Sequence, residues 1–259
     1  MVVCGVDIGS LSTKAVLMEN DEILAWCIVP TGPDSVESAE RAVGAVLGEE
    51  NLALGHIGYT VATGYGRANV PFADKTISEI SCHAAGSHWT FPEVRTILDM
   101  GGQDCKAIRC DENGRISNFI MNDKCAAGTG RYLERVADSL GLALDSIGPL
   151  SMAAVDEVLS VGSNCVVFAE GDIIRLQRAS KKTNDILAGA TDAIVERIVE
   201  LLERVGVEPD LCISGGVAKN IGVVRRVEQK LGLRARIAKE PQIMGALGAA
   251  LLAPKRQPG

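Results

Sequence analysis

The opening thirty residues of the chain predict a meander of three short strands. The three apolar runs, VVCGVDI, TKAVLM and EILAWCIVP, are separated by short polar or glycine-containing segments. Apolar runs bounded by turn residues are typical of β-strands. From Val36 to Leu47 the apolar residues instead recur at steps of three and four, which predicts a helix. The chain therefore begins as an α/β unit.

The same strand and turn pattern occurs a second time. The segment VRTILDMGGQDCKAIRC contains an apolar strand, an Asp-x-Gly turn and another apolar strand, in the order seen at the start of the chain. We interpret the repetition as a duplicated, two-lobed architecture whose boundary lies near Arg95. Residues 1–95 then form the N-terminal lobe and residues 96–259 the C-terminal lobe, with a cleft between the lobes.

Helical patterns dominate the second half of the chain. The segments GTGRYLERVADSLG and DILAGATDAIVERIVELLERVG predict helices, and in the second of these the apolar residues form a continuous stripe. DLCIS then predicts a strand that runs into a glycine turn. MGALGAALLA, near the end, predicts a helix of small residues that can pack very closely against a neighbour.

Composition and charge exclude several classes of protein. The chain of 259 residues is 47% apolar and 23% charged, which is ordinary globular usage. Its net charge is -7 and it has no dense Lys/Arg tract, which argues against binding to nucleic acid or to an anionic membrane. No apolar run approaches the roughly 18 residues of a membrane span, and no basic, signal-like segment opens the sequence. We therefore expect a cytoplasmic protein.

Glycine residues gather at three turns that could bind phosphate. They are found in DIGS, DMGGQD and SGG, each at the end of an apolar strand. A glycine lets backbone N–H groups point at an anion, and a nearby carboxylate can hold the accompanying Mg²⁺. Any one of these segments alone is more often a plain turn, but the three in this order predict a phosphate clamp. No GxxxxGK[ST] motif is present, so the clamp is not a P-loop.

The three turns resemble the nucleotide-binding signature of the acetate and sugar kinase, Hsp70 and actin superfamily. In that superfamily DIGSLSTK corresponds to the first phosphate loop, DMGGQD to the second and ISGGVAKN to the adenosine loop. The resemblance implies ATP or ADP as ligand. It implies that the phosphates are faced on one side by Gly9, Ser10, Thr13 and Lys14, and on the opposite side by Gly101 and Gly102. It also implies that the adenosine is approached by Gly215, Gly216 and Asn220, that the Mg²⁺ shell is held by Asp7 and Asp99, and that the attacking water is oriented by Gln103 or Asp104.

Two of the eight cysteines precede predicted helices. Cys125 lies in NDKCAAGTGRYLE and Cys165 in SNCVVFAE, where the positive end of a helix would favour a thiolate or an anionic cluster. Spacing alone leaves open the alternative that both are small core residues. Cys4, Cys27, Cys82 and Cys212 are expected in the core. Cys105 and Cys110 could in principle form a metal-binding pair, but residues five apart on a strand face opposite sides, which argues against it. His83 and His88 are expected on a helix surface, because their spacing matches no ligand motif.

Longer motifs identify a narrower family. The strings ATGYGR, SEISCHAAGSHW, DMGGQD, NDKCAAGTGRYLE, CVVFAE and GGVAKN, in this order, resemble the ATPase activators of 2-hydroxyacyl-CoA dehydratases. That family also includes subunits of ATP-dependent benzoyl-CoA reductases and the reductases of double-cubane-cluster proteins. The resemblance covers residues 3–252 and implies a two-lobed, actin-like ATPase fold built from duplicated ribonuclease-H-like domains.

The family also implies a redox function. It implies a homodimer with one [4Fe-4S] cluster at its interface, held by Cys125 and Cys165 of each subunit. The dimer would be reduced by one electron from ferredoxin or flavodoxin. The reduced dimer would then bind ATP and transfer that electron to a larger iron-sulfur dehydratase or reductase. Two other classes remain open at this point. One is a sugar or acid kinase of the same superfamily, with Asp104 as its general base, and the other is an actin-like regulatory module.

Overall fold

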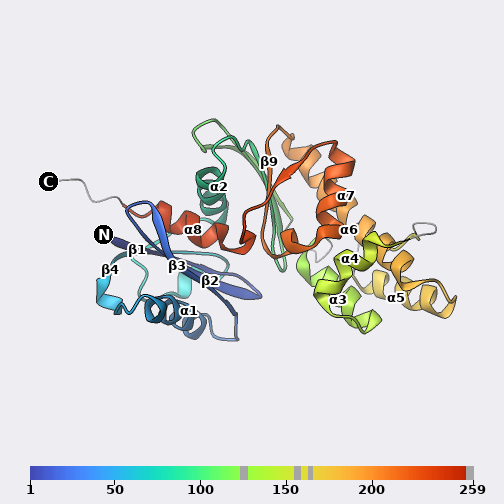
Figure 1. Ribbon diagram of the computed structural model, residues 1–259, viewed down its shortest axis with the longest axis horizontal. Coiled ribbons are helices and arrows are strands. Elements are labelled where there is room, and N and C mark those ends of the chain that lie inside the picture. The colour runs from blue at the N-terminus through green and yellow to red at the C-terminus, as the bar shows by residue number, and fades with distance from the viewer. Residues whose placement is uncertain (123–127, 155–158, 163–165, 255–259) are drawn as a thin grey trace.

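The computed structural model describes residues 1–122, 128–154, 159–162 and 166–254. Cys125 and Cys165 lie outside the described residues. Within the described ranges the strands form two five-stranded mixed sheets, with helices on both faces of each (Figure 1). The predicted α/β class and the two-lobed architecture are therefore confirmed.

The first sheet contains the meander predicted from the opening residues. Strands β1 and β2 and strands β2 and β3 pair antiparallel, whereas β4 and β5 continue the sheet in parallel beside β1. The sheet has the order β3-β2-β1-β4-β5, with bounds β1 (Val2–Ile8), β2 (Ser12–Glu19), β3 (Glu22–Pro30), β4 (Ile57–Thr63) and β5 (Lys75–Thr76).

The second sheet repeats this topology strand for strand. Two antiparallel pairings are again followed by two parallel ones, in the order β8-β7-β6-β9-β10. Its bounds are β6 (Thr96–Met100), β7 (Cys105–Cys110), β8 (Ile116–Asn122), β9 (Leu211–Ser214) and β10 (Ala235–Arg236). Residue 95 therefore separates the strands of the two sheets. As a domain boundary, the division at residues 95 and 96 stays a prediction.

Two helices near the centre of the molecule cross from one half of the chain to the sheet of the other. Helix α2 (Glu79–Thr90) follows the first sheet in sequence but packs on the second, where Ala84 joins Ile97 and Ile108 in one apolar cluster. Helix α8 (Met244–Leu251), the predicted small-residue helix, packs on the first sheet. Figure 1 shows α2 and α8 side by side between the sheets.

The remaining helices complete the layers. Helix α1 (Ser35–Glu49) covers the other face of the first sheet and begins at Asp34, whose carboxylate accepts hydrogen bonds from the backbone at Val36 and Glu37. Helix α6 (Thr183–Val205) covers the other face of the second sheet. The other helices are α3 (Gly130–Leu140), α4 (Ile147–Met152), α5 (Val166–Arg178) and α7 (Ile221–Leu231), and the 3₁₀ helices are η1 (Leu54–His56), η2 (Arg67–Asn69), η3 (Leu144–Ser146), η4 (Gly216–Lys219) and η5 (Pro241–Ile243).

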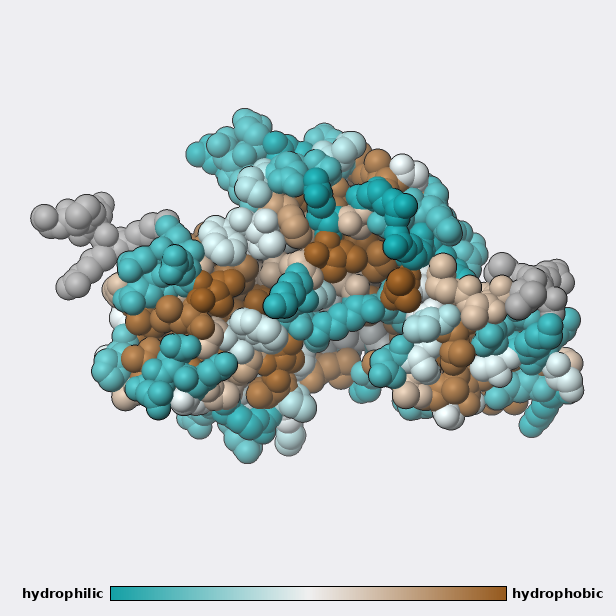
Figure 2. Space-filling model, viewed as in Figure 1, coloured by the Kyte–Doolittle hydropathy of each residue, from teal (hydrophilic) through white to brown (hydrophobic). Residues whose placement is uncertain are grey.

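The surface is mainly polar at the periphery. In the view of Figure 2, hydrophilic side chains cover most of the outer face, and hydrophobic residues surface in patches along the middle of the molecule. Among the described residues, no helix has the length and the apolar character needed to cross a bilayer.

Candidate functional site

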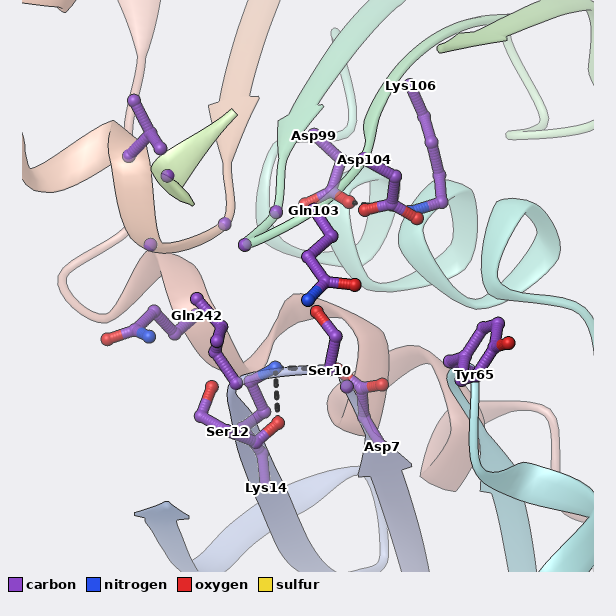
Figure 3. Close-up of a pocket in the computed structure, with 18 of the residues that line it drawn as sticks. Asp7, Ser10, Ser12, Lys14, Tyr65, Asp99, Gln103, Asp104, Lys106 and Gln242 are labelled. Atoms are coloured by element: carbon purple, nitrogen blue, oxygen red, sulfur yellow. Dashed lines mark hydrogen bonds and ion pairs between the residues drawn. The ribbon is translucent and has the colours of Figure 1, made fainter. Parts of the chain in front are cut away.

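A cavity of about 1010 Å³ lies between the two sheets. Its walls come from the loop after β1, the loop between β6 and β7, and the turn that connects β9 to η4 (Figure 3). The tertiary structure thus brings together three glycine turns that lie far apart in sequence. The predicted residues that line the cavity are Asp7, Gly9, Ser10, Lys14, Asp99, Gly101, Gly102, Gln103, Asp104, Gly215, Gly216 and Asn220.

Thr13 is placed differently from the other predicted phosphate residues. Its side chain is fully buried, and its hydroxyl lies 2.8 Å from the hydroxyl of Thr31. The Thr31 hydroxyl donates to the carbonyl oxygen of Gly9 at 2.9 Å, so Thr13 must donate to Thr31. Thr13 therefore supports the first glycine loop from behind and does not line the cavity.

The first lobe presents a carboxylate and an ammonium group at the cavity wall. Asp7 on β1 and Lys14 on β2 lie directly opposite each other in the antiparallel register. The Lys14 Nζ atom is 3.2 Å from Asp7 Oδ2, and it also donates to the Ser12 carbonyl oxygen at 3.2 Å. Figure 3 shows both side chains at the floor of the cavity. The turn between the strands is closed by the Gly9 amide, which donates to the Ser12 carbonyl oxygen at 3.1 Å.

The second lobe repeats this pair with a lysine that we did not predict. Asp99 on β6 lies opposite Lys106 on β7, and the Gly101 amide closes the turn onto the Asp104 carbonyl oxygen at 2.9 Å. Lys106 Nζ lies 3.4 Å from Asp99 Oδ2. The signal for Lys106 was present in the sequence, because an Asp-x-Gly motif is followed by a lysine seven residues after the aspartate in both lobes.

Lys106 has more partners than Lys14. Besides Asp99, its Nζ atom contacts Asp104 Oδ2 at 2.7 Å and Glu79 Oε2 at 2.9 Å. Burial alone would lower the pKa of Lys106, but the three carboxylates raise it above its ordinary value. Lys106 is therefore a permanent cation on the wall of the cavity.

The two aspartates of the second loop differ in their environments. Burial favours a raised pKa for Asp99, but its interactions with His83 and Lys106 outweigh it and hold the pKa below its usual range. Asp99 is thus a carboxylate at neutral pH. For Asp104, burial raises the pKa and outweighs the contact with Lys106. A carboxyl group with a raised pKa on a cavity wall is suited to accept or orient a proton.

His83 corrects the sequence-based expectation of a surface residue. It is 5% exposed and lines the cavity, with Nδ1 3.4 Å from Asp99 Oδ1. The same Asp99 oxygen accepts a hydrogen bond from the Ser214 hydroxyl at 3.1 Å. The expectation failed because α2 crosses to the second sheet, and nothing local in the sequence indicates that crossing.

Glycines with positive φ allow the neighbouring strands to approach these aspartates. Gly215, at φ +84°, follows β9, and a Cβ atom there would lie 2.3 Å from the Met100 carbonyl oxygen. Gly64, at φ +89°, follows β4, and its Cβ would lie 2.5 Å from Asp7 Oδ1. A side chain at either position would clash with the loop that carries the aspartate. The duplication therefore extends to the glycines that make room for the site.

Further lining residues come from the helical side of the cavity. Asn220 lines the cavity but also caps α7, since its Oδ1 atom accepts a hydrogen bond from the Val223 amide at 3.1 Å. The apolar lining residues on this side include Leu133, Leu144 and Val217. The lining residues that sequence reasoning missed, besides Lys106 and His83, include Tyr65, Arg67, Glu79, Leu133, Glu134, Leu144, Asp145, Lys219 and Gln242.

The donor set of the cavity suits Mg²⁺. Asp7 and Asp99 offer buried carboxylate oxygens from opposite lobes. Mg²⁺ is usually bound by one or two carboxylates together with water and phosphate oxygens. The two aspartates therefore fit the ion, provided that a phosphate ligand completes the shell.

The described cysteines do not offer a competing ligand set. Cys4, Cys82 and Cys212 are buried, and burial raises the pKa of each thiol to about 12, so they are protonated at neutral pH. Cys105 and Cys110 belong to different apolar clusters, on opposite faces of β7. Cys4, Cys82 and Cys212 therefore have the core placement expected from the sequence, whereas Cys27, also expected in the core, is only half-buried. Cys105 and Cys110 face opposite sides of their strand, as expected.

Two duplicated lobes that enclose one cavity, with matching Asp–Lys pairs and glycine turns, define an actin-like nucleotide-binding fold. Comparison with known proteins places the chain more narrowly. It belongs to the BadF/BadG/BcrA/BcrD ATPase family, whose model matches residues 4–253.

Individual relatives cover nearly the full chain. The activator of lactoyl-CoA dehydratase from Anaerotignum propionicum is 46% identical over 98% of this chain and 97% of its own length. The (R)-2-hydroxyglutaryl-CoA dehydratase activating ATPase from Acidaminococcus fermentans is 40% identical over 97% and 96%. The solved activator of 2-hydroxyisocaproyl-CoA dehydratase from Clostridium difficile, with bound ADPNP, superimposes with a TM-score of 0.93 at 41% identity, covering 98% of this chain and 94% of that one. The predicted family is therefore confirmed.

Proposed function

We propose that this chain is an ATP-hydrolysing activator that delivers single electrons to a larger iron-sulfur enzyme. The observation that carries the proposal is the cavity, where the paired lobes place two Asp–Lys pairs and three glycine turns around one space. The relatives that match this chain over nearly its whole length are named activators and an activating ATPase of 2-hydroxyacyl-CoA dehydratases. The partner is accordingly a 2-hydroxyacyl-CoA dehydratase, a benzoyl-CoA reductase or a double-cubane protein.

Different residues of the cavity bind the parts of ATP and promote its hydrolysis. The amides of the first two glycine loops and Lys14 contact the phosphates, and the third glycine turn contacts the adenosine. Asp7 and Asp99 would hold Mg²⁺, which neutralises charge on the phosphate oxygens when bound. Gln103 or Asp104 orients the attacking water, and hydrolysis yields ADP and phosphate.

The electron would be carried by a [4Fe-4S] cluster shared by two copies of the chain. Cys125 and Cys165 of each copy supply the four thiolates that such a cluster needs. Helix α5 begins at Val166, the residue after Cys165 in the sequence. A thiolate next to a helix start would be favoured by the helix dipole. Val167 and Phe168 are 64% and 72% exposed, which supports a second copy covering this end of α5.

Nucleotide binding and electron transfer must be coupled through the two lobes. The cluster takes one electron from a ferredoxin or flavodoxin and passes that electron to the partner's iron-sulfur centre. A nucleotide bound between the lobes favours one relative position of the lobes over others. The helices that follow Cys125 and Cys165 move with their lobe. The complementarity of the surface that binds the partner enzyme, and the solvent exposure of the cluster, then differ between the ATP-bound and ADP-bound forms.

The first experiment measures iron and sulfide in anaerobically purified protein, with the visible spectrum before and after dithionite. We expect about four irons per dimer and bleaching on reduction. The Cys125→Ser variant is expected to lose the cluster while it still binds ATP, because Cys125 is not among the residues proposed to contact the nucleotide. Cys27→Ser serves as the control, since Cys27 is half-buried and donates to the Ala42 carbonyl oxygen at 3.1 Å.

Each alternative outcome is informative. A colourless, folded protein that binds ATP and consumes it only with a sugar or acid acceptor would support the kinase reading instead. Unchanged iron in Cys125→Ser would remove that residue from the ligand set.

A further inference from the structure

Glu79 occupies a position between the lobes that the mechanism above does not use. It is the first residue of α2, the helix that leaves the first lobe and packs on the second sheet. Its Oε2 atom is 2.9 Å from Lys106 Nζ in the second lobe. Its Oε1 atom is 3.7 Å from Arg67 Nη1, which comes from the loop after β4 in the first lobe. One carboxylate therefore contacts a cation from each lobe at the cavity wall.

Three carboxylates surround the Lys106 ammonium group while Glu79 is in place. An ammonium group carries three N–H donors. Lys106 is 2% exposed, and its Nζ atom is surrounded by Glu79, Asp104 and Asp99 at 2.9, 2.7 and 3.4 Å. Lys106 donates hydrogen bonds to Asp104 and Asp99, and its ion pair with Glu79 adds a third contact that restrains the ammonium group beside them.

The first lobe lacks this arrangement. Lys14 contacts one carboxylate, Asp7, together with the Ser12 carbonyl oxygen. In the second lobe, the lysine of the Asp99–Lys106 pair also contacts Asp104 from its own loop and Glu79 from α2. Because the two lobes otherwise match, the added carboxylates point to a task that only the second loop performs, and that loop carries Gln103 and Asp104.

We propose that Glu79 is a positioning residue for ATP hydrolysis, which acts through Lys106 to hold Asp104 in the orientation that the attacking water requires. The inference rests on the proposed function, since it assumes hydrolysis in this cavity. Without the Glu79 charge, the Lys106 ammonium group loses one of its three carboxylate contacts, and Asp104, which it contacts at 2.7 Å, is no longer held in one orientation. The Glu79 carboxylate also contacts Arg67 of the first lobe. Both contacts of Glu79, with Arg67 and with Lys106, therefore form only when the two lobes hold this relative position.

Steady-state ATP hydrolysis by the dimer tests the proposal in the Glu79→Gln variant. We expect kcat to fall roughly tenfold or more while the KM for ATP and the affinity for ADPNP change less than about threefold, as for an interaction made in the transition state. Glu40→Gln on α1 removes an exposed carboxylate far from the cavity and is expected to match the wild type.

A double-mutant cycle shows whether Glu79 acts through Lys106. Lys106→Met lowers kcat, and adding Glu79→Gln to it is expected to cause no further loss, because the residue through which Glu79 acts is already gone. Additive losses would overturn the proposal. So would an unchanged kcat in Glu79→Gln, or a loss of ADPNP affinity and thermal stability as large as the loss of kcat. A wild-type protein that binds ADPNP but hydrolyses no ATP would overturn the proposed function itself, and the positioning role with it.

Discussion

Asp7 and Asp99 each lie near the end of a central strand, where the carboxylate is buried. A buried carboxylate is costly unless a positively charged partner lies beside it. In both lobes that partner is the lysine directly opposite on the adjacent antiparallel strand. The spacing of seven residues follows from the turn, since a tight loop between paired strands fixes which residues face each other. Each aspartate therefore has its lysine partner within its own lobe, before any ligand binds.

The role of Asp7 can be tested by the Asp7→Asn substitution, which preserves its size but removes its charge. We expect Mg-ATP turnover to fall roughly 10–100-fold, the range typical when a group that orients a metal is lost. The apparent affinity for Mg²⁺ should fall with it, whereas iron content should stay at the wild-type value. A titration of ATPase rate against Mg²⁺ measures this, and a normal rate would exclude Asp7 from the metal shell.

At the scale of elements, the contact between α2 and α8 depends on small residues. The helices approach so closely that a Cβ atom on Gly248 would lie 1.7 Å from the Cys82 carbonyl oxygen, and one on Gly86 would lie 2.2 Å from that of Met244. The obstacles are backbone atoms, which cannot turn aside as a side chain can. The glycines therefore set the distance between the helices, and through it the relation of the two sheets.

Gly248→Ala is consequently expected to destabilise the protein by roughly 1–3 kcal/mol or more, as overpacking does in a well-packed core. The matched control is Gly44→Ala in α1, where a Cβ atom meets nothing within 4 Å. That change is expected to stabilise by roughly 0.5–1 kcal/mol, because alanine is the better helix former. Urea unfolding monitored by circular dichroism compares the two, and equal stability of both variants would refute the close-packing argument.

For the whole molecule, one ligand contacts both lobes. The cavity of about 1010 Å³ is bounded by loops from both sheets, so a nucleotide inside it adds contacts between parts of the chain that otherwise meet mainly through α2 and α8. A ligand that binds only the folded form must raise the free energy of unfolding.

Mg-ADPNP at about one hundred times its Kd should therefore stabilise the fold by about 2.7 kcal/mol. For a chain of this size that corresponds to a rise in Tm of roughly 5–11 °C. Differential scanning calorimetry with and without the nucleotide measures the shift. Mg²⁺ alone is the control, and an unchanged Tm with Mg-ADPNP would show that the cavity does not take the nucleotide.

Much of the fold was predictable because it depends on local patterns. The meander, α1 and α8 were each expected from apolar spacing, and the duplication was visible in the two Asp-x-Gly turns. Strand β8 was missed because it lies at the edge of its sheet and its burial does not alternate. Helix α7 was not predicted, although Asn220, at the end of the SGGVAKN turn, caps its start.

The sequence by itself determined the three glycine turns, their aspartates and the family, because each of these is carried by residues close together in the chain. Only the tertiary structure decided that His83 and Glu79 belong to the site and that Thr13 supports it from behind. The physical reason is the crossing of α2 to the second sheet. A helix can pack its apolar side on either of two sheets, and that choice depends on the close contact with α8, more than 150 residues away along the chain.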